Sequence, residues 1–445
     1  MSSTQTAEHV ALLHHHHGSP ATSFSTYQRD IYASFRSPIF SVDPMKWEAL
    51  ARRKIPDSNF YYVAGSANQG LTCAANVGAF ARYRLRPRML ADATFRDTSV
   101  EIFGQKLASP LIVAPIGVQG IVHKDGEEAT ARACQKLDIP MILSTAATRS
   151  IEEVAAANGT GKRWYQIYWP KPEHDDITIS LLQRAQASGY SVLVVTADTF
   201  ALGWRPKDLD SSYLPFIYGQ GCQVGFSDPV FNKKYEAAQR EANKRPLWTR
   251  LRELFEVLLR PQSLWGALKI LWNIKAISKS RAWLDVVNSG TYRTWDDLRV
   301  LRANWAGPIV LKGVQTVEDA RLAAEHGLDG IVVSNHGGRQ VDGAVASLDA
   351  LAVITADERV KTSGLTVLFD SGVRTGSDVI KALALGARGV LIGRPYMYGL
   401  AIAGQRGVEH VLKCTLADFD NTLGLIGKLN VRQLGRDDLE IVASA

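Results

Sequence analysis

The sequence contains few cysteines, and this scarcity limits what the chain can be. Its four cysteines, in a chain of 445 residues, form no CxxC pair. They are Cys73, Cys134, Cys222 and Cys414. Their scattered positions predict neither a disulfide framework nor a zinc site, so no metal is expected, and they fit a reducing compartment.

Long apolar runs are also missing. No window of about eighteen apolar residues occurs, which argues against a membrane-spanning helix. The opening residues MSSTQTAEHVALL lack the basic and then apolar pattern of a signal peptide. We therefore expect a cytoplasmic protein in which residues 1–26, with their histidine run from His14 to His17, form a disordered leader.

The basic character of the chain is confined to one segment. The formal net charge is +7, yet residues 232–282 alone hold twelve Lys or Arg against four Asp or Glu. The remainder has 39 basic and 40 acidic residues and no recognisable nucleic-acid module. Nucleic acid is therefore not expected as a partner.

Eight apolar, β-branched runs recur along the rest of the chain. They read PLIVAPIG (110–117), PMILSTAA (140–147), RWYQIYW (163–169), SVLVVTADT (191–199), GPIVLKGV (307–314), GIVVSNH (330–336), TVLFDSGVR (366–374) and GVLIGRPY (389–396). Most are separated by helix-like stretches such as 126–137, 317–327 and 376–386. This alternation predicts an α/β fold, a parallel (β/α)8 TIM barrel, over residues 27–445, with a doubly wound open sheet as the alternative.

The spacing between the fourth and fifth runs is unusually long, which indicates a helical insertion over about 206–295. Leu247, Leu251, Leu254, Phe255, Leu258 and Leu259 recur at helical spacing, and Leu264, Trp265, Leu268, Leu271 and Trp272 do so again. Two amphipathic helices are predicted. Their basic faces and tryptophans suit an anionic membrane surface, but packing on the barrel or on another subunit is the favoured interpretation.

Polar residues gather where the predicted strands end. In such barrels the carboxyl ends of the strands and the loops that follow form the active-site face. The residues at these ends are Gln166, Tyr168, Thr196, Asp198, Lys312, His336, Arg339, Asp370, Arg374, Gly393 and Arg394. Any one of them has an ordinary structural explanation, but together they predict an active site.

Each of these residue types suggests a task. The glycines of DSGVRTG and IGRP allow backbone amides to approach an anion, and Arg374 and Arg394 add charge where such barrels often hold phosphate. Lys312 would stabilise negative charge on a bound cofactor. His336 is a natural base, and Asp198 on a neighbouring strand would orient it.

A carboxylate grip completes this interpretation. Arg205 and Arg339 have the planar, forked geometry that binds a carboxylate through two hydrogen bonds. The residues alone therefore indicate a barrel enzyme that binds a phosphate-bearing cofactor and takes a proton from a small carboxylic acid.

Several stretches resemble one enzyme family. SNHGGRQ, LKGVQTVEDARLA, FDSGVRTGSDVIKALALGARGVLIGRP and YQIYWP are similar to the FMN-dependent L-2-hydroxy-acid oxidases and dehydrogenases, which include glycolate oxidase, lactate oxidase and flavocytochrome lactate dehydrogenase. GWRPKDLDSSYLPF and DPVFNKK resemble the lactate 2-monooxygenase branch. The resemblance runs from about Tyr27 to the last helices and excludes most of 236–285.

The resemblance implies roles for matching positions. Tyr62, Arg205 and Arg339 would hold the substrate carboxylate, Tyr168 would contact its hydroxyl, and His336 would be the base with Asp198 as its partner. The residues implied for FMN are Pro115, Ile116, Gly117, Ser144, Gln166, Thr196, Lys312, Ser334, Asp370, Arg374, Gly393 and Arg394. Ala146 stands where glycolate oxidases carry a tryptophan beside the substrate, which predicts a wider pocket.

Several functions remain open at this point. The first is oxidation of a lactate-like L-2-hydroxy acid with oxygen as acceptor, followed by release of peroxide or by oxidative decarboxylation of the bound keto acid. The second is a membrane-peripheral dehydrogenase that passes electrons to a quinone or a protein. The third is a non-catalytic flavin barrel, which the intact His, Asp and Arg set disfavours. The family resemblance also implies a homo-tetramer or homo-octamer.

Overall fold

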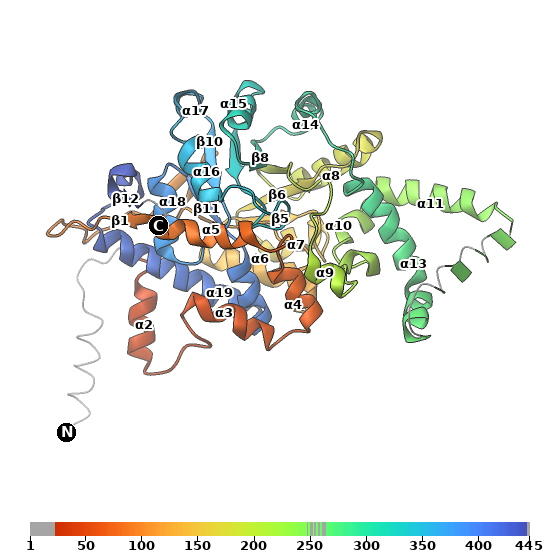
Figure 1. The fold of residues 1–445 in the computed structure, drawn as a ribbon, viewed down its shortest axis with the longest axis horizontal. Coiled ribbons are helices and arrows are strands. Elements are labelled where there is room, and N and C mark those ends of the chain that lie inside the picture. Colours follow the sequence, from red (N-terminus) through yellow and green to blue (C-terminus); the bar gives the residue numbers. More distant parts are fainter. Residues whose placement is uncertain are drawn as a thin grey trace.

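A computed structural model of the chain describes residues 23–246 and 264–442, together with 248, 249, 252, 255, 256 and 259. Its centre is a closed barrel of eight parallel strands in the order β10-β11-β4-β5-β6-β7-β8-β9. Figure 1 shows the whole fold. The strands are β4 (Leu111–Val113), β5 (Met141–Ser144), β6 (Arg163–Tyr168), β7 (Leu193–Thr196), β8 (Ile309–Val314), β9 (Gly330–Val333), β10 (Thr366–Phe369) and β11 (Gly389–Ile392). The predicted barrel is confirmed. Most strands are shorter than the apolar runs, because the residues at the carboxyl ends turn into loops.

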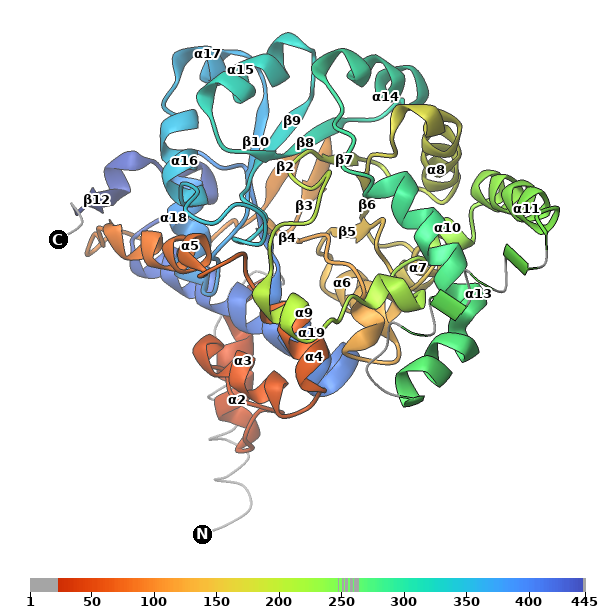
Figure 2. The same ribbon diagram turned by 45° about the vertical axis from the view of Figure 1, so that its right-hand side comes forward.

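Helices surround the barrel (Figure 2). They are α6 (Gly126–Leu137), α7 (Ile151–Asn158), α8 (Asp175–Ala187), α14 (Leu298–Asn304), α15 (Val317–Glu325), α16 (Ser347–Ile354), α17 (Glu358–Thr362), α18 (Gly376–Ala384) and α19 (Arg394–Leu425). Local sequence explains several of their starts. Ser150 and Glu153 form a reciprocal capping box at α7, and Thr375 and Asp378 do the same at α18.

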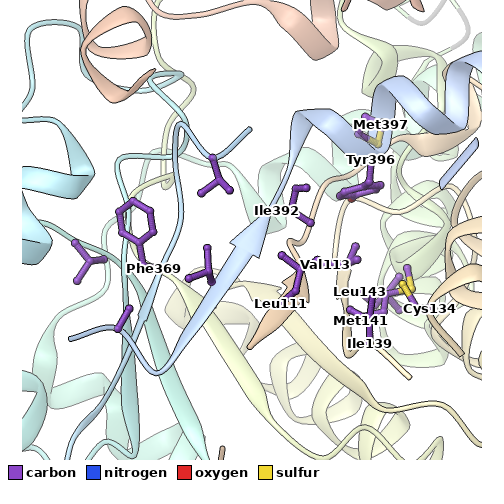
Figure 3. Packing of buried hydrophobic residues seen from close by; sticks show 14 of the residues in the cluster. Leu111, Val113, Cys134, Ile139, Met141, Leu143, Phe369, Ile392, Tyr396 and Met397 are labelled. Atoms are coloured by element: carbon purple, nitrogen blue, oxygen red, sulfur yellow. The ribbon is translucent and has the colours of Figure 1, made fainter. Parts of the chain in front are cut away.

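The core forms two layers because successive strand residues point to opposite sides of the sheet. Ile112, Ile142 and Val194 belong to a buried cluster with Ile102 and Leu107 of the hairpin β2 (Val100–Ile102) and β3 (Gln105–Leu107). The alternate residues belong to a second cluster shared with the helices, and Figure 3 shows Leu111, Val113 and Leu143 near Tyr396 and Met397 of α19. The strands are thus buried on both sides, as a parallel barrel requires.

The amino-terminal residues add four described helices and a small sheet. These are α2 (Thr26–Ser34), α3 (Pro44–Arg52), α4 (Asp57–Ala64), α5 (Leu71–Arg82) and β1 (Tyr83–Leu85), which pairs with β12 (Leu439–Ile441). Residues 1–22 of the predicted leader lie outside the described residues. Ser23 donates a hydrogen bond to Asp420, and so does the backbone N–H of Ser25, so contacts with the barrel domain begin before Tyr27.

The insertion follows β7 and is mostly helical. It contains α9 (Pro206–Asp210), η3 (Pro215–Tyr218), α10 (Gln223–Phe226), α11 (Pro229–Asn243), α13 (Leu264–Val287) and η4 (Trp295–Asp297). Parts of α11 and α13 project away from the barrel (Figure 1). The first predicted amphipathic helix, 247–259, falls largely outside the described residues, whereas the second is the beginning of α13.

The two halves of α13 have different surroundings. In the first half Leu268 is 48% exposed and Trp272 is 92% exposed, whereas in the second half Trp283 is 1% exposed. The second half therefore packs on the barrel. The predicted apolar residues Leu268, Leu271 and Trp272 lie in the first half and are exposed, so they do not pack on the barrel, and their packing on another subunit stays a prediction. Within the described part of the chain, the structure has no helix whose length and hydropathy would let it cross a membrane.

Candidate active site

His336 and Asp198 form the centre of the site. His336 follows β9 and Asp198 follows β7, so β8 lies between their strands, which are not neighbours as the sequence had suggested. His336 Nδ1 lies 2.8 Å from Asp198 Oδ1, and Thr199 Oγ1 donates to the same oxygen at 2.7 Å. Burial opposes ionisation of Asp198, but attraction to His336 and Lys312 holds the pKa of this carboxyl well below its usual range. An ionised carboxylate only accepts hydrogen bonds, so Nδ1 carries the hydrogen and Nε2 keeps a lone pair.

The charge state of His336 also suits a base. Burial lowers the pKa of its imidazole, and although Asp198 favours the protonated form, Lys312 and Arg205 disfavour it. The net shift is downward from 6.5, so the ring is neutral at neutral pH. His336 lines the main cavity of the site, while Asp198 does not. The histidine therefore faces the cavity and the carboxylate stands behind it.

The loop that carries His336 has an unusual backbone. His336 has φ of 58°, and Gly337 and Gly338 follow with φ of 66° and 73°. A Cβ on Gly338 would lie 2.5 Å from the Cys73 nitrogen, so only glycine fits there. Left-handed conformation at a non-glycine residue such as His336 is uncommon and is often found at functional sites.

The loop is held in place by α5. Asn76 and Asn335 exchange side-chain hydrogen bonds of 2.8 and 2.7 Å, and both side chains are buried. The Asn335 carbonyl oxygen also accepts from the Gly338 N–H at 3.1 Å. This amide pair was not predicted from the sequence, because Asn76 lies on a helix far from the motif.

Lys312 places a cation at the barrel centre. Its side chain is 5% exposed, and its Nζ lies 3.0 Å from Ser334 Oγ and 3.4 Å from Asp370 Oδ2. Burial disfavours its charge, yet attraction to Asp370 and Asp198 raises the pKa above its ordinary value. Lys312 is therefore a fixed ammonium that can stabilise negative charge on a group bound beside it.

Arg205 and Arg339 lie together at the cavity. Arg205 Nε donates to the Arg339 backbone carbonyl at 3.1 Å, and its Nη2 donates to Gln340 Oε1 at 2.9 Å. Gln340 also donates to the Asp198 backbone carbonyl at 2.8 Å. It thus couples Arg205 to the Asp198 loop, a contact that was not predicted from the sequence although Gln340 ends the motif SNHGGRQ.

Two tyrosines supply neutral hydroxyl donors. Tyr62 and Tyr168 both line the cavity, and burial raises the pKa of each to about 12. The Arg339 guanidinium lies over the Tyr62 ring, 5.4 Å from its centroid. Both hydroxyls remain protonated at neutral pH and can donate to an anionic or alkoxide oxygen.

The arginines in this cavity lack acidic partners. Among the described residues, no carboxylate oxygen lies within 4.0 Å of the guanidinium groups of Arg205, Arg339, Arg374 or Arg394. Burial, followed by repulsion from Arg205 and Arg394, lowers the pKa of Arg339 to about 9. Burial and Arg394 likewise lower the pKa of Arg374. Such uncompensated cations are suited to bind anions, and the two predicted anions are a substrate carboxylate and a cofactor phosphate.

The other predicted cofactor residues fall into two groups. Pro115, Ile116, Gly117, Asp370 and Gly393 line the cavity together with Lys312, Arg374 and Arg394. Ser144, Gln166, Thr196 and Ser334 are buried behind this lining. Gln166 donates to Thr196 at 3.0 Å, which fixes the amide below the cavity floor.

The loop after β4 depends on small residues. A Cβ on Gly117 would lie 2.5 Å from the Ala146 Cβ, so this loop passes close to Ala146 only because residue 117 is glycine. Buried Glu127 accepts hydrogen bonds from Gln119 N–H at 3.0 Å and Thr148 N–H at 2.9 Å, which ties this loop to the one after β5. Nothing in the sequence pattern indicated this role for Glu127. Gly117 lines the cavity together with Lys312, Arg374 and Arg394, and this combination of a small residue with fixed cations fits the ring and phosphate of FMN.

Comparison with known proteins agrees with this arrangement. A family model described as FMN-dependent dehydrogenase matches residues 51–441. The chain is 45% identical to the FMN-dependent alpha-hydroxy acid dehydrogenase qulF of Penicillium citrinum, over 94% of this chain and 96% of that protein. It is 35% identical to an L-lactate oxidase of Lysinibacillus sphaericus, over 87% of this chain and 89% of that protein. A crystal structure of mandelate oxidase superimposes with a TM-score of 0.70 at 32% identity, covering 90% of this chain and 98% of that one.

Proposed function

This chain belongs to the FMN-dependent dehydrogenase family and is an FMN-dependent 2-hydroxy-acid oxidoreductase, and we propose that it oxidises small L-2-hydroxy acids with dioxygen as electron acceptor. The observation that carries the proposal is the His336–Asp198 pair, 2.8 Å apart, at a cavity that Arg205 and Arg339 also line. A base and two arginines able to bind a carboxylate, at one cavity, match a substrate that carries both a carboxylate and a removable proton.

Each side chain has a defined part in this reaction. Arg205 and Arg339 hold the substrate carboxylate with Tyr62, and Tyr168 donates to the hydroxyl oxygen. His336 Nε2 accepts a proton from the substrate, and ionised Asp198 stabilises the imidazolium that forms. FMN, when bound, accepts the two electrons, and Pro115, Gly117 and Lys312 are among the residues that would hold its ring.

Electron transfer to oxygen leads to one of two products. Release of the keto acid gives free peroxide, whereas a keto acid that stays bound is attacked by peroxide and loses carbon dioxide. We favour at least partial oxidative decarboxylation, because the segment GWRPKDLDSSYLPF after β7 resembles the lactate 2-monooxygenase branch and supplies Arg205. Retention of product by such loops decides between the outcomes.

A dehydrogenase that uses a quinone or a protein acceptor is the second candidate. The exposed Trp272 and the basic residues of the insertion favour it, as does the dehydrogenase name of the relative from Penicillium citrinum. With either function we also propose that the protein is a homo-oligomer and has a cytoplasmic location.

Anaerobic reduction of the bound flavin tests the proposal. The holoenzyme is mixed with L- and D-forms of lactate and longer 2-hydroxy acids, and bleaching of the flavin absorbance is expected with L-forms only. Turnover of lactate in air should then give acetate in amounts comparable to or above pyruvate, with little peroxide. Stoichiometric pyruvate and peroxide would identify a simple oxidase, and rapid reoxidation by membranes but not by oxygen would identify the dehydrogenase.

A further inference from the structure

The second half of α13 approaches the barrel closely enough to become part of the site. A Cβ on Gly225 of α10 would lie 2.3 Å from the Trp283 ring, so the glycine lets the indole sit directly on the α10 backbone. The same ring packs edge-on against Phe231 of α11 at 5.1 Å. Trp283 is therefore wedged between α10, α11 and the cavity, which fixes the position of the helix.

The end of α13 is also bound to the loops after β6 and β7. Lys171 N–H donates to the Val286 carbonyl at 3.1 Å, and Gly290 N–H donates to the Phe200 carbonyl at 3.1 Å. Lys171 Nζ lies 2.7 Å from Asp285 Oδ2. These loops follow Tyr168 and Asp198, so the helix end is held at a set distance from the catalytic residues.

In the barrel order, β6 and β7 lie opposite β10 and β11. Arg374 and Arg394, the expected phosphate ligands, follow β10 and β11. The carboxyl-terminal end of α13 therefore lies on the opposite side of the barrel opening from Arg374 and Arg394, where the cofactor phosphate is expected.

The cavity lining on this side is mostly apolar, with Asn288 and Thr199 as its polar members. Trp283, Leu284 and Val287 of α13 line the cavity, together with Ala146, Leu202 and Phe216. A substrate held by Arg205, Arg339 and Tyr168 has its carboxylate and hydroxyl satisfied, so its remaining substituent is the part that this wall can bind. Ala146 and the half-buried Leu284 and Val287 leave that substituent room.

We propose that α13 supplies the wall that binds the substrate side chain, and that the enzyme prefers L-2-hydroxy acids with a large apolar side chain, branched or aromatic, over lactate. This inference rests on the proposed function and names its substrate class. Lactate offers only a methyl group, whereas a hydrophobic pocket gains about tenfold or more in specificity for each methylene that it buries well.

The test is the specificity constant of the holoenzyme for L-lactate, L-2-hydroxy-4-methylpentanoate and L-3-phenyllactate. We expect kcat/KM to rise at least about tenfold from lactate to the better of the larger acids. Val287→Phe places a larger side chain in the wall and fills the space in front of it. It should lower the ratio of kcat/KM for the larger acid to kcat/KM for lactate by about tenfold or more. Leu284→Ala, a milder change, should also shift the ratio while keeping flavin bound.

Val286→Ala is the matched control, because Val286 is buried on the same helix but does not line the cavity. Its ratio should equal that of the parent. An unchanged ratio in both Val287→Phe and Leu284→Ala, or a parent that prefers lactate, would overturn the inference while leaving 2-hydroxy-acid oxidation intact. Absence of flavin reduction by every acid would overturn the proposed function itself, and this inference with it.

Discussion

Replacing Asp198 with asparagine tests whether the carboxylate acts through His336. The substitution keeps a hydrogen-bond acceptor near Nδ1 and removes the negative charge. Two unit charges about 4 Å apart attract by about 4 kcal/mol at an effective dielectric constant of 20. Part of this is retained by the amide hydrogen bond, so we expect the transition state to lose about 2–3 kcal/mol, which slows flavin reduction about 30- to 150-fold.

The pH profile separates this effect from a general loss of structure. Reduction requires neutral His336, and Asp198 is among the groups that raise the pKa of that imidazole. Removal of the carboxylate lowers the pKa further, so the acidic limb of kcat/KM should move to lower pH in Asp198→Asn. The slowing at pH 7 is then a loss of imidazolium stabilisation and not a change in the fraction of neutral histidine.

Thr199→Val is the matched control for the same site. Thr199 Oγ1 donates to Asp198 Oδ1 at 2.7 Å, so this change removes a neighbouring hydrogen bond and keeps the charge. A loss of about 1 kcal/mol, or about fivefold, is expected. Stopped-flow reduction under anaerobic conditions measures all three proteins. A rate in Asp198→Asn within about threefold of the parent, with an unmoved acidic limb, would refute the assigned role of Asp198.

Four further predictions concern other parts of the molecule. His336→Ala should retain FMN but reduce it about a hundred- to ten-thousandfold more slowly in stopped-flow assays, and a parent-like rate would assign the base elsewhere. Arg374→Gln should weaken FMN about 10- to 150-fold while leaving riboflavin, which has no phosphate, unaffected in fluorescence titrations; equal losses for both would contradict a phosphate contact. Removal of FMN should lower the melting temperature, because a ligand at a hundred times its Kd adds about 2.7 kcal/mol; calorimetry that shows equal values would contradict an anion-dependent site. Deletion of 246–277 should reduce the size of the oligomer measured by light scattering. If the parent instead binds vesicles and the deletion abolishes their co-sedimentation, the insertion binds a membrane surface.

The sequence predicted the barrel well because the strands of a parallel barrel are buried on both faces. Runs such as GIVV at 330–333 are apolar without alternation, and the loops after them carry the polar residues. Since barrel topology brings all the carboxyl ends to one face, His336 and Lys312 could be placed in one site without knowing any distance. The observed contacts among His336, Asp198 and Lys312 agree with that placement.

Contacts made by single residues on other elements could not be predicted in the same way. Gln340 and Asn76 act through hydrogen bonds to loops, and these contacts depend on the path that three left-handed residues at 336–338 give the chain. The contacts of the second half of α13 were equally hidden, because the helical periodicity seen in the sequence ended at Trp272, before the residues 283–287 that reach the cavity. Gly225 determines that contact, and a glycine in the sequence does not reveal which ring will lie on it.

The cations proposed to bind the ligands also act with burial to favour the neutral form of His336. The cavity holds Lys312 and four arginines, and among the described residues the guanidiniums of those arginines have no carboxylate partner. Keeping these positive charges in the cavity costs free energy until anions enter it. We propose that this cost favours binding of the cofactor phosphate by Arg374 and Arg394 and of the substrate carboxylate by Arg205 and Arg339. Burial lowers the pKa of His336, and Lys312 and Arg205 lower it further, which opposes the effect of Asp198 and leaves the imidazole able to accept a proton. Once a proton has moved to His336, Asp198 is the carboxylate placed to stabilise the new charge, at 2.8 Å from Nδ1. The cations around the cavity thus favour neutral His336 before proton transfer. The Asp198 carboxylate behind the histidine favours the imidazolium during it.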